Sequence, residues 1–227
     1  MLERLTYLYG NKINDIKNKT VLIIGLGGVG SYALESIARS GVNNIIIVDN
    51  DTIDITNLNR QLLTLRSNID EFKVDVAYKR IKDINPDCNI IKIKEFITKE
   101  NIDILFNNKI DYLIDAIDTI ETKKEIITEC LKRNIKFISA MGNANKTDPT
   151  KLKIMDIRKT SYDPIAKIIR KHVKDLKTNK KVMVVCSEEK PIIKNKLGSN
   201  SFTPSVAGLL CSSYVINDIV GEIWLMN

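Results

Sequence analysis

Short runs of apolar, mostly β-branched residues alternate with longer amphipathic stretches through the first 140 residues. Uninterrupted apolar runs are typical of strands that are buried on both faces of a parallel sheet. The runs predict strands at residues 21–24, 45–48, 90–93, 112–115 and 137–139. Apolar residues recur at helical spacing over 29–40 and 70–84, which predicts two helices. Gly41 ends the first helix and Pro86 ends the second. This alternation predicts an α/β fold with a doubly wound, Rossmann-like, mostly parallel sheet.

The alternation loosens after Gly142, where the chain becomes richer in lysine. The elements predicted in this part are a strand over 151–157, a basic helix over 163–177, a strand over 181–185 and an apolar helix that begins at Thr203. We therefore divide the chain into a Rossmann-like core over 1–146 and a basic C-terminal α+β extension over 147–227. We expect the extension to pack on the core.

The composition is that of a packed protein, with 44% hydrophobic and 28% charged residues in a chain of 227. No apolar run approaches the roughly 20 residues that cross a bilayer, and Glu3 and Arg4 lie where a secretion signal needs apolar residues. The four cysteines are far apart and form no C-x-x-C pair for zinc or dithiol chemistry. We expect a cytoplasmic protein with no membrane segment.

Positive charge is concentrated in the C-terminal part of the chain. The net charge is +7, and residues 151–200 hold 14 Lys/Arg against 5 Asp/Glu, so the rest of the chain is slightly acidic. A segment of this kind suits a polyanion such as a nucleic acid. A general lysine bias of the composition, with abundant Ile and Asn, explains the charge equally well. Composition alone does not separate the two interpretations.

A glycine-rich motif, G-x-G-x-x-G, lies between the first predicted strand and the first predicted helix. Its glycines are Gly25, Gly27 and Gly30, with Gly28 between them, and Asp49 ends the next strand. In such a loop the first glycine permits a tight turn, the second lets the backbone approach a phosphate, and the third allows close packing of the helix. The helix N-terminus adds free N–H groups, and an acid at the second strand binds ribose hydroxyls. The motif predicts a nucleotide without specifying which one.

A nicotinamide-dependent dehydrogenase is the default interpretation of this motif, and the rest of the sequence does not support it. The one histidine, His172, lies in the lysine-rich helix without an acidic residue beside it to orient the ring. It is better interpreted as a surface residue than as a proton shuttle.

Polar residues that follow the strands favour a nucleoside triphosphate as the ligand. Asp51, Asn57 and Arg60 lie shortly after the second strand, and the planar guanidinium of Arg60 suits a phosphate. Lys73 lies in the first turn of the next helix, where the helix dipole disfavours a cation, so a nearby phosphate would offset that cost. Asp118 follows the next strand and suits a Mg²⁺ ion that is shared with phosphates.

With these residues, the chain resembles the ubiquitin-activating-enzyme superfamily, which adenylates carboxylates with ATP and includes molybdopterin-synthase and thiamine-biosynthesis adenylyltransferases. The motifs that carry the resemblance are Arg4-x-x-x-Leu8-x-Gly10, the glycine loop, Asp49-x-Asp51-Thr52, Asn57-x-x-Arg60-Gln61, Lys73-Val74, Ile84-Asn85-Pro86 and Asp115-x-x-Asp118. The resemblance implies that the core over 1–146 binds ATP and Mg²⁺.

The resemblance also implies a role for each residue. Asp49 would bind the ribose, with Asp51 beside it. The phosphates would be bound by Asn57, Arg60 and Lys73, and the metal by Asp118. Arg4 would reach into the active site of a second subunit, which implies a homodimer. The residues expected to act in catalysis are thus Arg4, Arg60, Lys73 and Asp118.

The C-terminal third resembles the tRNA threonylcarbamoyladenosine dehydratases. The matching segments are Asp148-Pro149-Thr150, Asp156-Ile157-x-Lys159-Thr160, Asp163-Pro164-x-Ala166-Lys167 with Arg170, Cys186-Ser187-Glu188-Glu189, Gly198-Ser199 and Pro204 to Gly208. The resemblance implies a tRNA substrate and assigns the basic segment to a tRNA-facing surface. The candidate tRNA-binding residues are Lys159, Lys167, Arg170 and Lys171.

Such enzymes would adenylate the threonyl carboxylate, and the neighbouring carbamoyl group would then close a ring with net loss of water. Two other functions stay open. The first is adenylation of a ubiquitin-like sulfur carrier, against which the missing C-x-x-C pairs count, and the second is a nucleotide-dependent tRNA-binding module without turnover. Cys186 is interpreted as a buried packing residue rather than a nucleophile, because no histidine is near it in sequence. A sulfur-transfer protein is kept as a further candidate partner.

Overall fold

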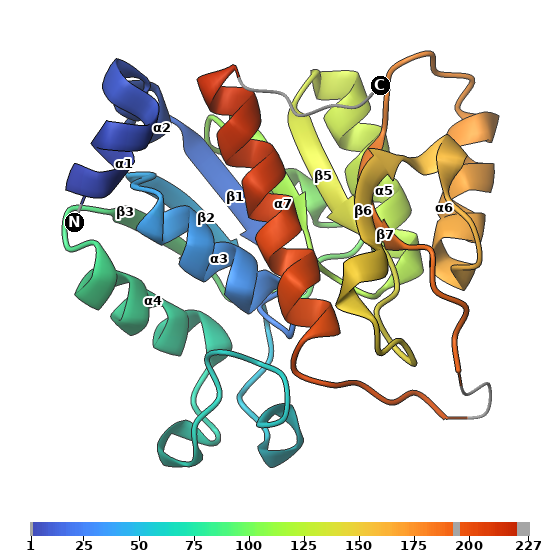
Figure 1. Cartoon of the computed structure of the whole chain (residues 1–227), viewed down its shortest axis with the longest axis horizontal. Coiled ribbons are helices and arrows are strands. Elements are labelled where there is room, and N and C mark those ends of the chain that lie inside the picture. Colours follow the sequence, from blue (N-terminus) through green and yellow to red (C-terminus); the bar gives the residue numbers. More distant parts are fainter. Residues whose placement is uncertain (1, 193–195, 222–227) are drawn as a thin grey trace.

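One twisted sheet runs through the whole molecule (Figure 1). The computed structural model describes residues 2–192 and 196–221, and in this part seven strands pair in the order β3-β2-β1-β4-β5-β7-β6. The strands are β1 Thr20–Ile24, β2 Asn44–Val48, β3 Asn89–Ile93, β4 Tyr112–Asp115, β5 Lys136–Ala140, β6 Leu152–Asp156 and β7 Met183–Ser187. All neighbours pair in parallel except β6 and β7, which are antiparallel. The predicted doubly wound, mostly parallel sheet is confirmed.

Helices cover both faces of the sheet. The α-helices of the described part are α1 Glu3–Tyr9, α2 Ile13–Lys17, α3 Gly30–Arg39, α4 Lys73–Ile84, α5 Ile120–Arg133, α6 Pro164–Asp175 and α7 Thr203–Val220. Apolar residues of α2, α3, α4 and α7 pack on one face, and those of α5 and α6 pack on the other. The inner strands β1, β2, β4, β5 and β7 are therefore buried from both sides, which explains their continuous apolar runs. The edge strands β3 and β6 are partly exposed. The sequence pattern did not predict α1 and α2.

The C-terminal part of the chain belongs to the same sheet as the core. β7 pairs in parallel with β5 and in antiparallel with β6, so the boundary at residue 146 falls inside a continuous sheet. Whether 1–146 and 147–227 behave as separate domains stays a prediction. No helix in the described residues is long and apolar enough to cross a membrane.

The last helix, α7, lies beside α3 (Figure 1), and a glycine permits their close approach. A Cβ on Gly208 would lie 2.2 Å from the carbonyl oxygen of Val29 and 3.0 Å from the nitrogen of Ala33. Both of these are backbone atoms, which cannot rotate away as a side chain can. Because Val29 belongs to the glycine motif, the position of α7 is tied directly to that loop.

We expect Gly208→Ala to lower the free energy of unfolding, although alanine is normally better than glycine in a helix by about 1 kcal/mol. The added methyl must push α7 away from α3, and overpacking of this kind costs about 1–3 kcal/mol. Urea unfolding followed by circular dichroism measures the change. The matched control is Ser213→Ala on the exposed side of α7, which should change stability by less than about 0.5 kcal/mol. A stabilised Gly208→Ala variant would contradict the prediction.

Candidate active site

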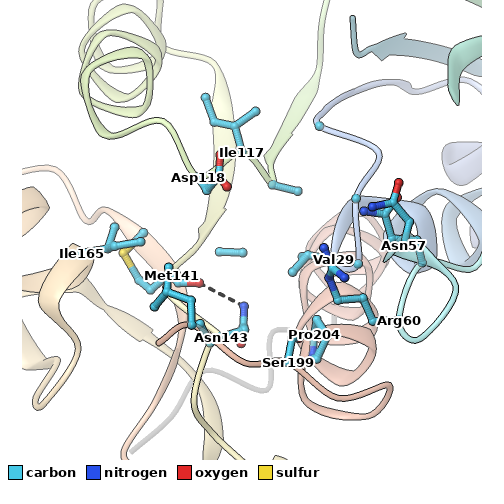
Figure 2. Close-up of a pocket in the computed structure, with 18 of the residues that line it drawn as sticks. Val29, Asn57, Arg60, Ile117, Asp118, Met141, Asn143, Ile165, Ser199 and Pro204 are labelled. Carbon is cyan, nitrogen blue, oxygen red and sulfur yellow. Dashed lines mark hydrogen bonds between the residues drawn. The ribbon is translucent and has the colours of Figure 1, made fainter. Parts of the chain in front are cut away.

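A cavity of about 1570 Å³ opens at the carboxyl ends of the central strands. Its lining includes Gly25 after β1, Asp49 after β2, Ala116 after β4 and Met141 after β5. The strand order reverses at β1, whose neighbours β2 and β4 lead to opposite sides, and ligands of open α/β sheets bind at such a point. Figure 2 shows Arg60 and Val29 on one wall of this cavity and Met141 and Ile165 on the opposite wall.

The glycine loop has the backbone geometry that its motif predicts. Gly25 has a φ of +85°, and a Cβ on Gly30 would lie 1.7 Å from the carbonyl oxygen of Gly25. Gly27 is different, because a Cβ there would meet nothing closer than the Gln61 side chain at 3.7 Å. The packing of the protein itself therefore does not require a glycine at 27, and the open space lies on the cavity side.

The N–H groups of this loop are available to a ligand. Among the described residues, no protein acceptor takes the backbone N–H of Gly27, Gly28 or Val29. These groups lie at the N-terminus of α3, where the helix dipole adds partial positive charge. Free N–H groups beside an open glycine form a binding site for an anion such as a phosphate.

Asp49 closes the loop from the end of β2. One carboxylate oxygen accepts a hydrogen bond from the Leu26 N–H at 2.6 Å, and the other accepts one from the Asp51 N–H at 2.8 Å. Burial raises the pKa of Asp49, against the opposing effect of the positive charge on Lys73 and of these two N–H donors. The carboxylate is thus held in one orientation at the floor of the cavity, where the sequence predicted contact with a ribose.

Lys73 is buried at the first position of α4 and lines the cavity, with 5% of its surface exposed. Its ammonium donates to the carboxylate of Asp51 at 2.7 Å. From the sequence, a phosphate ligand was expected to offset the unfavourable position of Lys73 in the helix dipole. In the structure Asp51 provides that relief, so the lysine is placed before any ligand binds.

Arg60 and Asn57 come from the polar segment after β2. Asn57 lies in a 3₁₀ turn, where its side-chain oxygen accepts a hydrogen bond from the Asp54 N–H at 3.1 Å. Arg60 donates to the Thr56 carbonyl at 3.0 Å and to the Asn59 side chain at 2.9 Å. It forms no ion pair within the described part of the chain. Its charge is therefore available to an anion in the cavity.

Asp118 lies in the loop after β4, exposed, at the cavity edge shown with Ile117 in Figure 2. It has no hydrogen-bond or ion-pair partner among the described residues. The predicted core set of Gly25, Gly27, Gly28, Asp49, Asp51, Asn57, Arg60, Lys73 and Asp118 thus lines one cavity. Gly30 lies directly behind the loop.

Beneath the cavity floor, a fully buried ion pair joins Lys123 of α5 to Asp115 at the end of β4, at 2.7 Å. Ser139 of β5 donates to the same carboxylate at 2.6 Å, and Lys123 also donates to the Ala140 carbonyl at 3.0 Å. This network fixes the ends of two neighbouring strands. Lys123 could not be assigned to the site from the sequence, because a lysine in an amphipathic helix normally faces water.

A second buried ion pair holds the opposite wall. Lys146, 2% exposed, donates to the Asp163 carboxylate and to the Gly142 carbonyl, each at 2.6 Å. Asp163 also caps α6 by accepting from the Ala166 N–H at 2.8 Å. The pair joins the segment after β5 to the start of α6. The pattern that begins α6, Asp163 followed by proline, was visible in the sequence, but its lysine partner was not.

Arg4 lies outside the cavity, exposed on α1. A Cβ on Gly41 would lie 2.8 Å from the side chain of Leu2, so Leu2 packs directly against Gly41. Gly41 follows the C-terminal end of α3, whereas the glycine loop is at the N-terminal end. Arg4 therefore has no contact with the cavity of its own chain, and its predicted role in a second subunit stays a prediction.

The candidate tRNA residues lie on and beside α6. Lys159, Lys167 and Lys171 are exposed and have no ion-pair partner in the described residues. Arg170 is only half exposed and donates to the carbonyl and hydroxyl oxygens of Thr160, both at 2.7 Å. Arg170 thus has a structural contact that the three lysines lack. The role of these four residues in tRNA binding stays a prediction.

These features define a nucleotide-binding α/β protein with an anion-binding loop at the switch point of its sheet. The chain belongs to the ThiF family, whose model matches residues 5–222. It is 45% identical to the tRNA threonylcarbamoyladenosine dehydratase of Bacillus subtilis over 93% of this chain and 91% of that protein. It is 35% identical to the dehydratase of Escherichia coli over 74% of this chain and 63% of that protein.

A solved structure agrees over nearly the whole chain. The Escherichia coli tRNA N6-threonylcarbamoyladenosine dehydratase, solved in complex with ATP, superposes with a TM-score of 0.90 at 30% identity, covering 96% of this chain and 92% of that one. A structure of Escherichia coli MccB with ATP superposes with a TM-score of 0.68 at 21% identity, which shows a shared fold alone. The family resemblance inferred from the sequence is confirmed.

The cysteines are buried thiols. All four are free and buried. Burial raises the pKa of Cys186 to about 12, against the opposing charges of Lys146 and Arg170, and raises those of Cys88 and Cys211 to about 11 and about 12. The predicted burial of Cys186 is confirmed.

We expect no thiol of the native protein to react with Ellman's reagent at pH 8, because access is blocked and the reactive thiolate is scarce well below the pKa. In urea all four cysteines should react. Absorbance at 412 nm follows the reaction, with the urea-unfolded protein as the control for reagent and protein concentration. Rapid reaction of one thiol in the native protein, lost in Cys186→Ala, would contradict the burial of Cys186.

Proposed function

We propose that this protein catalyses the ATP-dependent dehydration of N6-threonylcarbamoyladenosine beside the anticodon of tRNA. The observation that carries the proposal is the match to a dehydratase over 93% of the chain at 45% identity. The match includes the C-terminal third, which forms the second wall of the cavity. A protein that shared only the nucleotide-binding core would not require that wall.

The reaction has two steps. In the first, a threonyl carboxylate oxygen attacks the α-phosphorus of ATP, and the bond to the β-phosphate oxygen breaks as pyrophosphate leaves. In the second, a carbamoyl nitrogen or oxygen attacks the activated carbonyl carbon, a ring bond forms, and AMP leaves with one carboxylate oxygen. The carbamoyl group loses a proton, so the product is one water lighter than the substrate.

The core residues suit the first step. The free N–H groups of the glycine loop and the unpaired charge of Arg60 would bind phosphate oxygens, and the buried Lys73 would neutralise charge on the leaving pyrophosphate. Asp49 would bind the ribose at the end of β2. These groups are held in place by the protein's own contacts, so little reorganisation is needed when ATP binds.

Asp118 would hold Mg²⁺. Among the described residues no group of three or more His, Cys, Asp or Glu could hold a metal ion. A single exposed carboxylate nonetheless fits Mg²⁺ that is shared with phosphates, because this ion keeps several waters and commonly uses one or two carboxylates. When bound, the ion supplies positive charge to the phosphate oxygens.

The second step needs no enzyme nucleophile. The carbamoyl group and the acyl-adenylate belong to one side chain, and a well-oriented intramolecular reaction gains on the order of 7 kcal/mol from proximity. This agrees with the four buried thiols. It also leaves no accessible cysteine in the described residues that could accept sulfur, so a sulfur-transfer partner would have to act without such a relay.

We further propose that the exposed lysines on and beside α6 contact tRNA phosphates. Lys167 and Lys171 are one helical turn apart on α6, and Lys159 precedes the helix. Lysines without carboxylate partners can exchange their counterions for phosphates, which is the main source of tRNA affinity. We place the reaction in the cytoplasm, where tRNA is present and where free cysteines remain reduced.

The first test is mass spectrometry of nucleosides from threonylcarbamoylated tRNA that was incubated with the protein and Mg-ATP. We expect a product lighter by one water, formed together with AMP and only when ATP is present.

Asp118→Asn should lower the rate by at least about 100-fold, because it removes a charge that acts on the leaving group, and tRNA binding should persist. The control is Glu121→Gln, which changes an exposed carboxylate that lies outside the cavity. AMP release without a change in the tRNA would instead indicate another carboxylate substrate.

We also propose a homodimer in which Arg4 completes the site of the partner subunit. On the same helix, Tyr7 and Leu8 expose 77% and 68% of their surfaces, as expected of an interface.

Arg4→Ala and Asp118→Asn should each be inactive alone. When the two variants are mixed and allowed to exchange subunits, about a quarter of the wild-type activity should return, since half of the dimers are mixed and each then has one intact site. A mixture as inactive as its parts would show that Arg4 does not act across subunits.

A further inference from the structure

A strained turn places an aromatic ring at the cavity wall. Tyr162 has a φ of +59°, and the Asp163 N–H donates to the Ser161 carbonyl at 2.7 Å, which makes Tyr162 the central residue of a γ-turn. The form of this turn with positive φ is rare and strained. Among the described residues with positive φ other than glycine, Tyr162 is the aromatic one.

Both neighbours of the turn are anchored, so the strain cannot relax. On one side, the Thr160 hydroxyl donates to the Ile157 carbonyl at 2.7 Å, and Arg170 donates to the Thr160 carbonyl at 2.7 Å. On the other side, Asp163 is buried in its ion pair with Lys146. Strained backbone persists only where the surroundings determine it in this way, and it is concentrated at functional sites.

The strain is not explained by packing of the ring. The Tyr162 side chain is 57% exposed and belongs to neither core cluster. The residue lines the cavity together with Pro164 and Ile165, and Ile165 lies on the wall opposite Arg60 (Figure 2). The ammonium of Lys190 lies 5.0 Å from the centre of the ring. The turn therefore presents a flat aromatic surface with a cation beside it to the ligand space.

The size of the cavity leaves room for a second ligand on this side. A volume of about 1570 Å³ exceeds the roughly 300–1,000 Å³ of a typical small-molecule site. The helix α6 begins two residues after Tyr162, and its Lys167 and Lys171 are exposed. An aromatic ring next to lysines is the combination by which proteins bind unpaired RNA bases, with the base stacked on the ring and the backbone on the lysines.

We infer that the Tyr162 ring stacks on the modified adenine after that base has left the anticodon stack, and so directs its threonylcarbamoyl arm toward the glycine loop. Tyr162 is thereby a substrate-binding residue that selects an unstacked base. The inference rests on the proposed function, because it assigns the base of that substrate to this wall.

Three substitutions separate stacking from structure. Tyr162→Phe keeps an aromatic face and should keep the KM for modified tRNA within about threefold. Tyr162→Leu keeps the bulk without the π-face and should raise that KM by on the order of tenfold, with the KM for ATP unchanged. Tyr162→Gly should raise the KM for tRNA in the same way, yet raise the midpoint of thermal unfolding, because glycine adopts positive φ without strain.

The matched control is Phe202→Leu, since Phe202 is similarly exposed, at 50%, and does not line the cavity. This control should leave both KM values unchanged. Equal KM values for Tyr162→Leu and Tyr162→Phe, in an enzyme whose wild type dehydrates the tRNA, would overturn the stacking role and leave the proposed function intact. A wild-type protein that forms no dehydrated nucleoside would overturn the proposed function itself, and the inference with it.

Discussion

The structure depends on the close contact between α7 and the N-terminal end of α3. Gly208 permits α7 to approach the Val29 carbonyl, and a Cβ on Gly28 would lie 3.2 Å from Pro204 at the start of α7. Any side chain at 208 would separate the two helices and move the backbone that carries the free N–H groups. The anion-binding loop therefore owes its shape to a segment that is about 180 residues away in the chain and packs on it through backbone contact.

Two buried lysine–aspartate ion pairs hold the segments that form the walls of the cavity. The Asp115–Lys123 pair holds the ends of β4 and β5, and the Lys146–Asp163 pair holds the start of α6 against the segment after β5. Burying a charge pair contributes little net stability, but removing one partner of such a pair costs about 3–5 kcal/mol. These ion pairs therefore act mainly on geometry, because each of them holds the backbone of one cavity wall in a single position.

The sequence was most informative where one physical rule governs a position. Buried strands require apolar runs, so the inner strands β1, β2, β4, β5 and β7 could be predicted to within about two residues. The edge strands β3 and β6 are only partly buried, but enough apolar residues remain in them to mark their positions. The glycine motif and the acids after the strands could likewise be placed at one edge of the sheet. Where a residue's role depends on a distant partner, the prediction failed: Lys123 and Lys146 have the pattern of surface lysines, and only the fold reveals Asp115 and Asp163 beside them. The φ of Tyr162 likewise comes from anchors on both sides of it, which no local pattern encodes.

The order of the elements along the chain has a consequence for synthesis on the ribosome. The glycine loop is translated early, whereas α7, which packs against it, follows every strand of the sheet. N-terminal segments generally begin to fold first during translation. A nascent chain can therefore form much of the parallel sheet before α7 is available to pack on the glycine loop. The anion-binding loop would then take its final shape only after the residues of α7 have been translated.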